Sequence, residues 1–164
     1  MKGRLRDTSP VSHRIIVSSV LERDGHFLVI EEMVNGVQMI SQPAGLLEAG
    51  ESPSEGAVRE TLEESGVTFV PAHLVGIYQW YVPGTNTIYL RLSYTGKLYI
   101  PSGRAPAPSD PYILAVRWLT PEELLRERDR HRSPFVMQCV GDYLKGCRYP
   151  LDIVSSLQPS MLNS

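Results

Sequence analysis

The chain has 164 residues, of which 42% are hydrophobic and 21% are charged, and its formal net charge is −2. This composition excludes a wholly disordered, collagenous or coiled-coil protein, and the near-neutral charge argues against a protein that coats nucleic acid or an anionic membrane. The only cysteines, Cys139 and Cys147, form neither a disulfide framework nor a zinc-ligand pattern. We expect a cytoplasmic protein with neither a signal peptide nor a membrane span, since no apolar stretch reaches 18 residues.

The length fits one domain, which we place at residues 12–154, between a flexible N-terminal arm (1–11) and a loose C-terminal tail (155–164). The first strands are expected at Ile15–Val20, His26–Ile30 and Val37–Ile40. Asp24-Gly25 and Asn35-Gly36 supply the turn residues between them. The chain is therefore predicted to open as a β-meander.

A helix is predicted over Pro53–Ser65. Ser52 is suited to cap its first turn, Glu55 completes a capping box, and Gly66 ends it. Further strands are expected at Val67–Val70, Leu74–Val82, Thr87–Leu98 and Ile113–Leu119, a loop at Pro101–Pro111, and helices after Thr120 and from Ser133 to about Leu144. The pattern predicts an α/β fold with a mixed β-sheet between helices.

The predicted Pro53–Ser65 helix carries three glutamates on one face. At about 100° per residue, Glu63 and Glu64 lie within roughly 60° of Glu60, and Thr61 and Leu62 fall on the opposite, packing side. Like charges this close are unfavourable unless a cation joins them, and Mg²⁺ prefers oxygen ligands and bridges to phosphates. The helix alone allows two interpretations, a metal site for a phosphorylated ligand or a solvated acidic stripe.

The flanking residues resolve this choice. Gly45, Glu51, Arg59, Glu60, Glu63, Glu64 and Gly66 follow the spacing G-x5-E-x7-R-E-x-x-E-E-x-G. This pattern resembles the complete Nudix box, and the resemblance implies a Nudix-type α/β/α sandwich that hydrolyses nucleoside diphosphates linked to another moiety. Gln42-Pro43-Ala44, Gln79-Trp80, Arg132-Ser133-Pro134 and Arg148–Leu151 are similar to the NudJ phosphatase branch of that family.

The resemblance also implies roles for the residues of the box. The metal ligands would be Glu60, Glu63, Glu64 and the backbone carbonyl of Ala44, and the metal would be Mg²⁺, with Mn²⁺ as a substitute. The catalytic set would be Glu51, Arg59, Glu60 and Glu64, with the general base left open. Glu51 and Arg59 would form a charge pair that ties the loop to the helix and orients Glu60.

Outside the box we expect five substrate contacts: Gln42, Trp80, Arg91, Asp110 and Arg132. An aromatic residue such as Trp80 can stack on a substrate ring, but in a strand it often belongs to the core. Asp110 can lend a further carboxylate from its loop, or it can be a turn former with no other role. Arg91 and Arg132 are candidates for a distal phosphate, against the alternative of solvated surface charges.

The predicted function is a magnesium-dependent phosphohydrolase that removes phosphate from thiamine-type pyrophosphates and nucleoside di- and triphosphates. Its expected partners are small phosphorylated metabolites, and the chain is expected to be a monomer or homodimer. Two alternatives stay open. One is a pyrophosphohydrolase that releases a nucleoside monophosphate, and the other is a Nudix module that senses a nucleotide without cleaving it.

Overall fold

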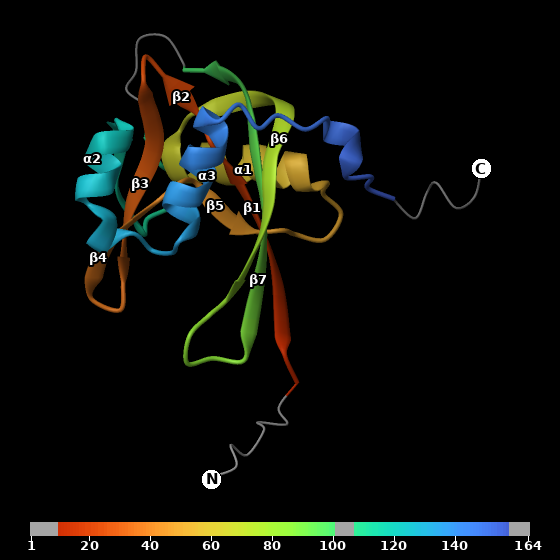
Figure 1. Cartoon of the computed structure of the whole chain (residues 1–164), viewed down its shortest axis with the longest axis horizontal. Coiled ribbons are helices and arrows are strands. Elements are labelled where there is room, and N and C mark those ends of the chain that lie inside the picture. The colour runs from red at the N-terminus through yellow and green to blue at the C-terminus, as the bar shows by residue number, and fades with distance from the viewer. Residues whose placement is uncertain (1–9, 101–106, 158–164) are drawn as a thin grey trace.

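The computed structural model describes residues 10–100 and 107–157, and over these ranges it has an α/β fold with two four-stranded sheets and three α-helices (Figure 1). The strands are β1 (Ser12–Ser19), β2 (Glu22–Arg23), β3 (His26–Val34), β4 (Val37–Ser41), β5 (Ala44–Leu46), β6 (Thr68–Tyr81), β7 (Thr87–Tyr99) and β8 (Ile113–Leu119). The helices are α1 (Pro53–Ser65), α2 (Pro121–Arg126) and α3 (Phe135–Leu144), with 3₁₀ turns η1 (Arg128–Arg130) and η2 (Leu151–Ile153). No helix in the described part of the chain could cross a membrane.

The first sheet has the strand order β5-β1-β7-β6 and is mixed, because β1 runs parallel to β7 while the other pairs are antiparallel. The second sheet contains β2, β3 and β4, with β8 paired to β3. Beyond the helices, β1, β6 and β7 extend together as a projecting arm (Figure 1). The predicted α/β class with a mixed sheet between helices is confirmed.

Two details of the strand prediction are wrong. The first strand does not form a hairpin with the next, because the Asp24-Gly25 turn joins the short β2 to β3 while β1 enters the other sheet. The meander therefore consists of β2, β3 and β4. The runs Val67–Val70 and Leu74–Val82 are parts of the single strand β6, which accommodates Pro71 and Gly76 next to register shifts in its pairing with β7. Irregular pairing of this kind lets a strand continue through residues that usually interrupt one.

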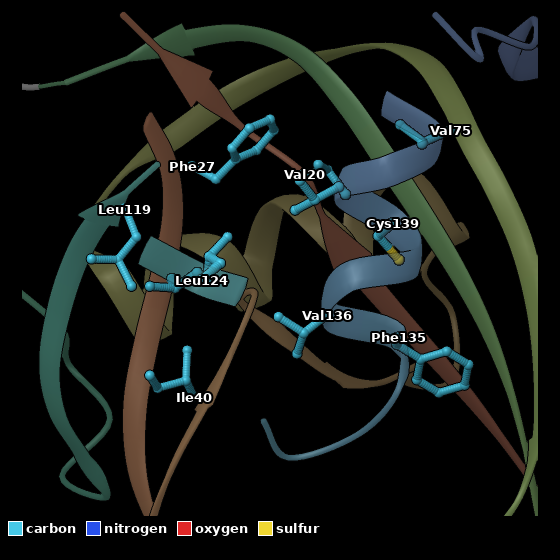
Figure 2. Close-up of a cluster of buried hydrophobic side chains, with 11 residues drawn as sticks. Val20, Phe27, Ile40, Val75, Leu119, Leu124, Phe135, Val136 and Cys139 are labelled. Atoms are coloured by element: carbon cyan, nitrogen blue, oxygen red, sulfur yellow. The ribbon is translucent and has the colours of Figure 1, made fainter. Parts of the chain in front are cut away.

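Helices cover both faces of the first sheet. Successive residues of a strand point to opposite sides, so the sheet presents apolar side chains on each face for a helix to cover. On one side, Ala57 of α1 packs with Val17 and Leu92 in a buried cluster. On the other side, α3 contributes Phe135 and Cys139 to a second cluster, which reaches α2 and the second sheet (Figure 2). The strands between these layers position the functional site.

The ends of the chain and one loop fall partly outside the described residues. Residues 1–9 of the predicted arm, 101–106 of the predicted loop and 158–164 of the predicted tail are not described. The predicted domain limits of 12 and 154 stay predictions. They lie next to the start of β1 at Ser12 and the end of η2 at Ile153.

Candidate active site

Helix α1 begins and ends where the sequence predicts. The Ser52 Oγ atom accepts a hydrogen bond from the Glu55 N–H at 3.3 Å, and the Ser52 N–H donates to Glu55 Oε2 at 2.7 Å. Gly66 ends the helix in the left-handed conformation, with φ 71°. This reciprocal cap satisfies donors that the first turn leaves free, and the αL glycine avoids the strain of a Cβ atom.

The buried face of α1 differs from the predicted one. Thr61 is fully buried as expected, but Leu62 is 50% exposed and Glu64 is only 7% exposed. The reason is helical periodicity, because Ala57, Thr61 and Glu64 follow the i, i+4, i+7 spacing of one continuous stripe. A carboxylate is thus buried on a stripe of α1 that the apolar residues of the helix do not predict.

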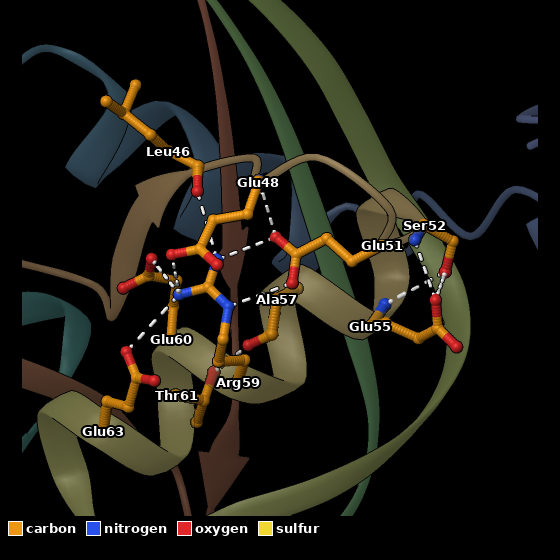
Figure 3. Close-up of polar contacts among 10 residues, drawn as sticks. All are labelled: Leu46, Glu48, Glu51, Ser52, Glu55, Ala57, Arg59, Glu60, Thr61 and Glu63. Carbon is orange, nitrogen blue, oxygen red and sulfur yellow. Dashed lines mark hydrogen bonds and ion pairs between the residues drawn. The ribbon is translucent and has the colours of Figure 1, made fainter.

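Arg59 is the centre of the polar network on α1 (Figure 3). Its Nε atom donates to Glu51 Oε2 at 2.9 Å, and its Nη2 atom donates to Glu51 Oε1 at 2.7 Å and to the Leu46 carbonyl at 3.1 Å. The predicted Glu51–Arg59 pair is therefore present and joins the loop after β5 to the helix. The hydrogen bonds from Arg59 lower the pKa of Glu51, because they favour the charged carboxylate.

Glu60 and Glu63 share the remaining guanidinium nitrogen of Arg59. The Nη1 atom lies 2.6 Å from Glu60 Oε1 and 3.4 Å from Glu63 Oε2. Glu60 also lies so close to Gly45 that a Cβ atom there would come within 2.1 Å of its carboxylate. Gly45 is therefore needed here because any larger residue would collide with Glu60. Burial raises the pKa of Glu60, although the hydrogen bond from Arg59 acts in the opposite direction.

Glu64 makes no ion pair with any described residue and accepts a hydrogen bond from the Ala44 N–H at 2.8 Å. Burial raises its pKa to about 8, the bond from Ala44 offsets part of that rise, and repulsion from Glu60 and Glu32 adds to it. Buried carboxylates are usually paired or coordinate a cation. A divalent ion beside Glu64 would supply the missing positive charge, so the donor set fits a metal that prefers oxygen ligands.

The four expected ligands are not arranged around a common point where such an ion could bind. No group of three or more His, Cys, Asp or Glu residues in 10–100 and 107–157 is positioned to hold a metal, since Glu60 and Glu63 are directed to Arg59. The N–H of Ala44, rather than its carbonyl, faces Glu64. The metal-ligand roles of these four residues therefore stay predictions.

A cavity of about 220 Å³ is lined in part by β5, the strand that contacts these carboxylates. Ala44 and Gly45 line it, and the same two residues contact Glu64 and Glu60. Its charged and aromatic lining residues are Arg14, Arg91, Arg132, Trp80, Tyr89 and Phe135. Positive charge and aromatic surface beside a carboxylate helix suit a ligand that combines phosphate with a ring.

Three of the five predicted substrate contacts line this cavity, namely Trp80, Arg91 and Arg132. Gln42 is fully buried, and its amide nitrogen donates to the Val136 carbonyl at 2.8 Å, so it does not reach the cavity surface. Asp110 does not line the cavity either. Its Oδ1 atom accepts from the Tyr112 N–H at 2.8 Å, as in a turn.

Even so, the Asp110 segment lies next to the carboxylate helix. The N–H groups of Ser109 and Asp110 donate to the Glu63 carbonyl at 2.8 and 3.1 Å. A Cβ atom on Gly66 would meet the Ala107 carbonyl oxygen at 2.4 Å. Residues 107–110 are therefore bound to the C-terminal end of α1, beside the predicted site.

Sequence reasoning missed four residues of this region: Arg14, Tyr89, Phe135 and Glu32. Arg14 and Tyr89 are neighbours only because β1 runs parallel to β7, a pairing that the local sequence does not reveal. Glu32 is nearly buried and forms an ion pair with Arg132 at the cavity. The available signal for Glu32 was the pair of acidic residues, Glu31 and Glu32, that directly follows the apolar run Phe27–Ile30 within β3.

Comparison with known proteins agrees with this geometry. The profile of the NUDIX domain matches residues 12–139. Phosphatase NudJ from Escherichia coli K12 is 38% identical over 140 residues, which cover 85% of this chain and 89% of that protein. A NUDIX hydrolase from Nitrosomonas europaea is 37% identical and superposes with a TM-score of 0.83 over 89% of this chain and 98% of that one.

A more distant structure shares the fold alone. The MutT protein from Methanosarcina mazei has a TM-score of 0.67 at 20% identity, over 82% of this chain and 96% of its own. Together, the domain match and the relatives show that the chain belongs to the Nudix family. It is a hydrolase of phosphoanhydride bonds, and hydrolases of this family generally use divalent metal ions.

Proposed function

We propose that this protein is a magnesium-dependent phosphohydrolase that removes phosphate from thiamine-type pyrophosphates and from nucleoside di- and triphosphates. The observation that carries the proposal is the position of the cavity. Its wall at Ala44 and Gly45 is also the contact surface of Glu64 and Glu60. A phosphate chain held at this wall would reach the carboxylates while an attached ring lies in the cavity. The similarity to Phosphatase NudJ supports this choice among Nudix activities.

The metal would be held by Glu60, Glu63, Glu64 and the carbonyl of Ala44. Bound there, Mg²⁺, or Mn²⁺ in its place, would neutralise phosphate charge and lower the pKa of a bound water. The protein's own task is positioning. Arg59 fixes the direction of Glu60, and Glu51 fixes Arg59 through two hydrogen bonds. Held geometry of this kind contributes much of the catalysis in phosphoryl transfer.

The cavity would hold the rest of the substrate. Trp80 and Tyr89, whose ring centroids lie 6.2 Å apart, offer a surface on which an aromatic ring can stack. Arg132 would contact a phosphate, although it is now paired with Glu32. Asp110 would add a carboxylate near Glu63. A cytoplasmic location and a monomer or homodimer belong to the same proposal, and the free thiols of Cys139 and Cys147 are consistent with a reducing compartment.

A substrate panel tests the proposed reaction. We expect orthophosphate from thiamine pyrophosphate and from nucleoside di- and triphosphates in the presence of Mg²⁺. Orthophosphate is measured before and after addition of inorganic pyrophosphatase, so that released pyrophosphate is detected separately. A signal that depends on the added pyrophosphatase, together with a nucleoside monophosphate, would instead show the pyrophosphohydrolase reaction.

A further inference from the structure

Arg91, in the middle of β7, is a buried cation that forms no ion pair with any described residue. The residue is 3% exposed. Its Nε atom donates to Ser18 Oγ at 2.9 Å, and its Nη2 atom donates to Gln42 Oε1 at 3.3 Å. Its guanidinium carbon lies 5.4 Å from the centroid of the Phe135 ring. All of these partners are neutral, and no described Asp or Glu forms an ion pair with it.

Such a residue is costly for the fold, because buried charges are normally paired or hydrogen-bonded to opposite charge. The neutral partners require a hydrogen-bond donor but not a positive charge, because the buried Oε1 atom of Gln42 accepts from Arg91 and from no other described group. Gln42 already donates to the Val136 carbonyl at 2.8 Å, and Ser18 Oγ lies 2.7 Å from Ser93 Oγ. Burial also lowers the pKa of Arg91, although attraction to Glu64 acts in the opposite direction. The packing around Arg91 therefore explains a hydrogen-bond donor at this position but not its full positive charge.

The orientation of Arg91 indicates what its charge is for. Arg91 lines the cavity, and the cavity lining contains three arginines and no acidic residue. Its Nη1 atom has no hydrogen-bond partner among the described residues. The Nη1 atom is not fully buried. Among the described residues, the only side-chain polar atom that is both fully buried and without a hydrogen bond is the Tyr78 hydroxyl oxygen. The guanidinium is thus held on two sides and open toward the cavity.

We propose that Arg91 forms the floor of an anion site that binds a phosphate group of the substrate independently of the divalent metal. Ser18 and Gln42 hold the guanidinium in place, and the phosphate supplies the ion-pair partner that no described residue provides. Arg132 differs from Arg91 in this respect, because Glu32 already neutralises it. The inference rests on the proposed function and deepens it, since it assigns one substrate phosphate to a residue outside the Nudix box.

The test is binding of inorganic pyrophosphate in excess chelator, measured by calorimetry and by the shift in Tm. The wild-type protein should bind pyrophosphate without metal. Arg91→Met, which keeps the length of the side chain but removes the charge, should bind about tenfold more weakly or worse, because hydrogen bonds to charged groups are the strong ones. Arg91→Lys should fall between the two, because it keeps the charge but loses the guanidinium fork.

The matched control is Arg128→Met. Arg128 carries the same charge on an exposed surface, with 73% of its side chain accessible, and lies outside the cavity. Its substitution should leave pyrophosphate binding unchanged. Circular dichroism of each variant checks the fold, and Arg91→Lys keeps the test decisive if Arg91→Met does not fold.

Two results would overturn the anion site. One is a wild-type protein that does not bind pyrophosphate without metal, and the other is folded Arg91 variants that bind as tightly as the wild type. Failure of the proposed function looks different. In that case metal-free binding persists and depends on Arg91, but no substrate of the panel is hydrolysed when Mg²⁺ is added.

Discussion

Replacement of Glu64 by glutamine is expected to lower kcat at least about a hundredfold while the protein stays folded. Glu64 is the most buried carboxylate of the box and forms no ion pair with a described residue. Glutamine keeps the shape and can still accept the hydrogen bond from the Ala44 N–H, but it cannot offer a negative ligand to a metal. Steady-state kinetics with saturating Mg²⁺ measure the effect, and circular dichroism checks the fold.

Glu55→Gln is the matched control, because Glu55 lies on the same helix but its carboxylate accepts from the Ser52 N–H and hydroxyl. That variant should keep wild-type turnover and lose little stability, because the Ser52 side chain still caps the first turn of the helix. Equal turnover in Glu64→Gln and Glu55→Gln would show that the carboxylate face of α1 takes no part in the chemistry.

The Glu64→Gln substitution should also change how stability depends on pH when no metal is bound. The folded-state pKa of Glu64 is raised from 4.5 to about 8, mainly by burial, so the folded protein holds this proton more tightly than the unfolded chain. The metal-free wild type should therefore lose stability as pH rises from about 4.5 to about 8. Glu64→Gln should show a flatter profile in urea unfolding, and at pH 8 it should be at least as stable as the metal-free wild type.

Loss of either partner in the Glu51–Arg59 pair is expected to reduce both stability and turnover. Their side chains are 17% and 23% exposed, so each single alanine variant should cost about 1–3 kcal/mol, between the values for exposed and buried pairs. Arg59→Ala should also slow turnover, because Arg59 contacts Glu60 and the Leu46 carbonyl as well. Urea unfolding and kcat measure the two effects.

A double-mutant cycle isolates the interaction. Glu51→Ala with Arg59→Ala should be more stable than the sum of the two single losses predicts, by at least about 0.5 kcal/mol. The control cycle uses Arg128 and Asp129, an exposed pair 3.8 Å apart, and should show little coupling. Strictly additive losses at Glu51 and Arg59 would contradict a direct interaction and would reassign Arg59 to another role, such as contact with substrate phosphate.

Local chemistry explains what the sequence could predict. The limits of α1 follow from Ser52, Glu55 and Gly66, which act within one or two turns of the helix. The Glu51–Arg59 pair spans eight residues across the same helix start. These interactions depend little on the rest of the fold, so spacing and residue type were sufficient to anticipate them.

Tertiary pairing explains what the sequence could not predict. The parallel pairing of β1 with β7 brings Arg14 beside Tyr89, although 75 positions separate them. Gln42 was expected to contact the substrate, yet packing against α3 encloses it completely. Likewise, Glu64 is buried because the sheet contacts a stripe of α1 that its apolar residues do not mark. Each error concerns long-range packing rather than local propensity.

The most direct measurement of the central claim is the rate of orthophosphate release from a nucleoside triphosphate while Mg²⁺ is titrated into chelator-treated protein. If the carboxylates of α1 hold a catalytic metal beside the cavity, hydrolysis should be absent in excess chelator, and addition of Mg²⁺ should restore it. Millimolar Mg²⁺ should also raise Tm, because ligand binding stabilises the folded state and relieves repulsion among the glutamates. Undiminished hydrolysis in excess chelator would contradict the account.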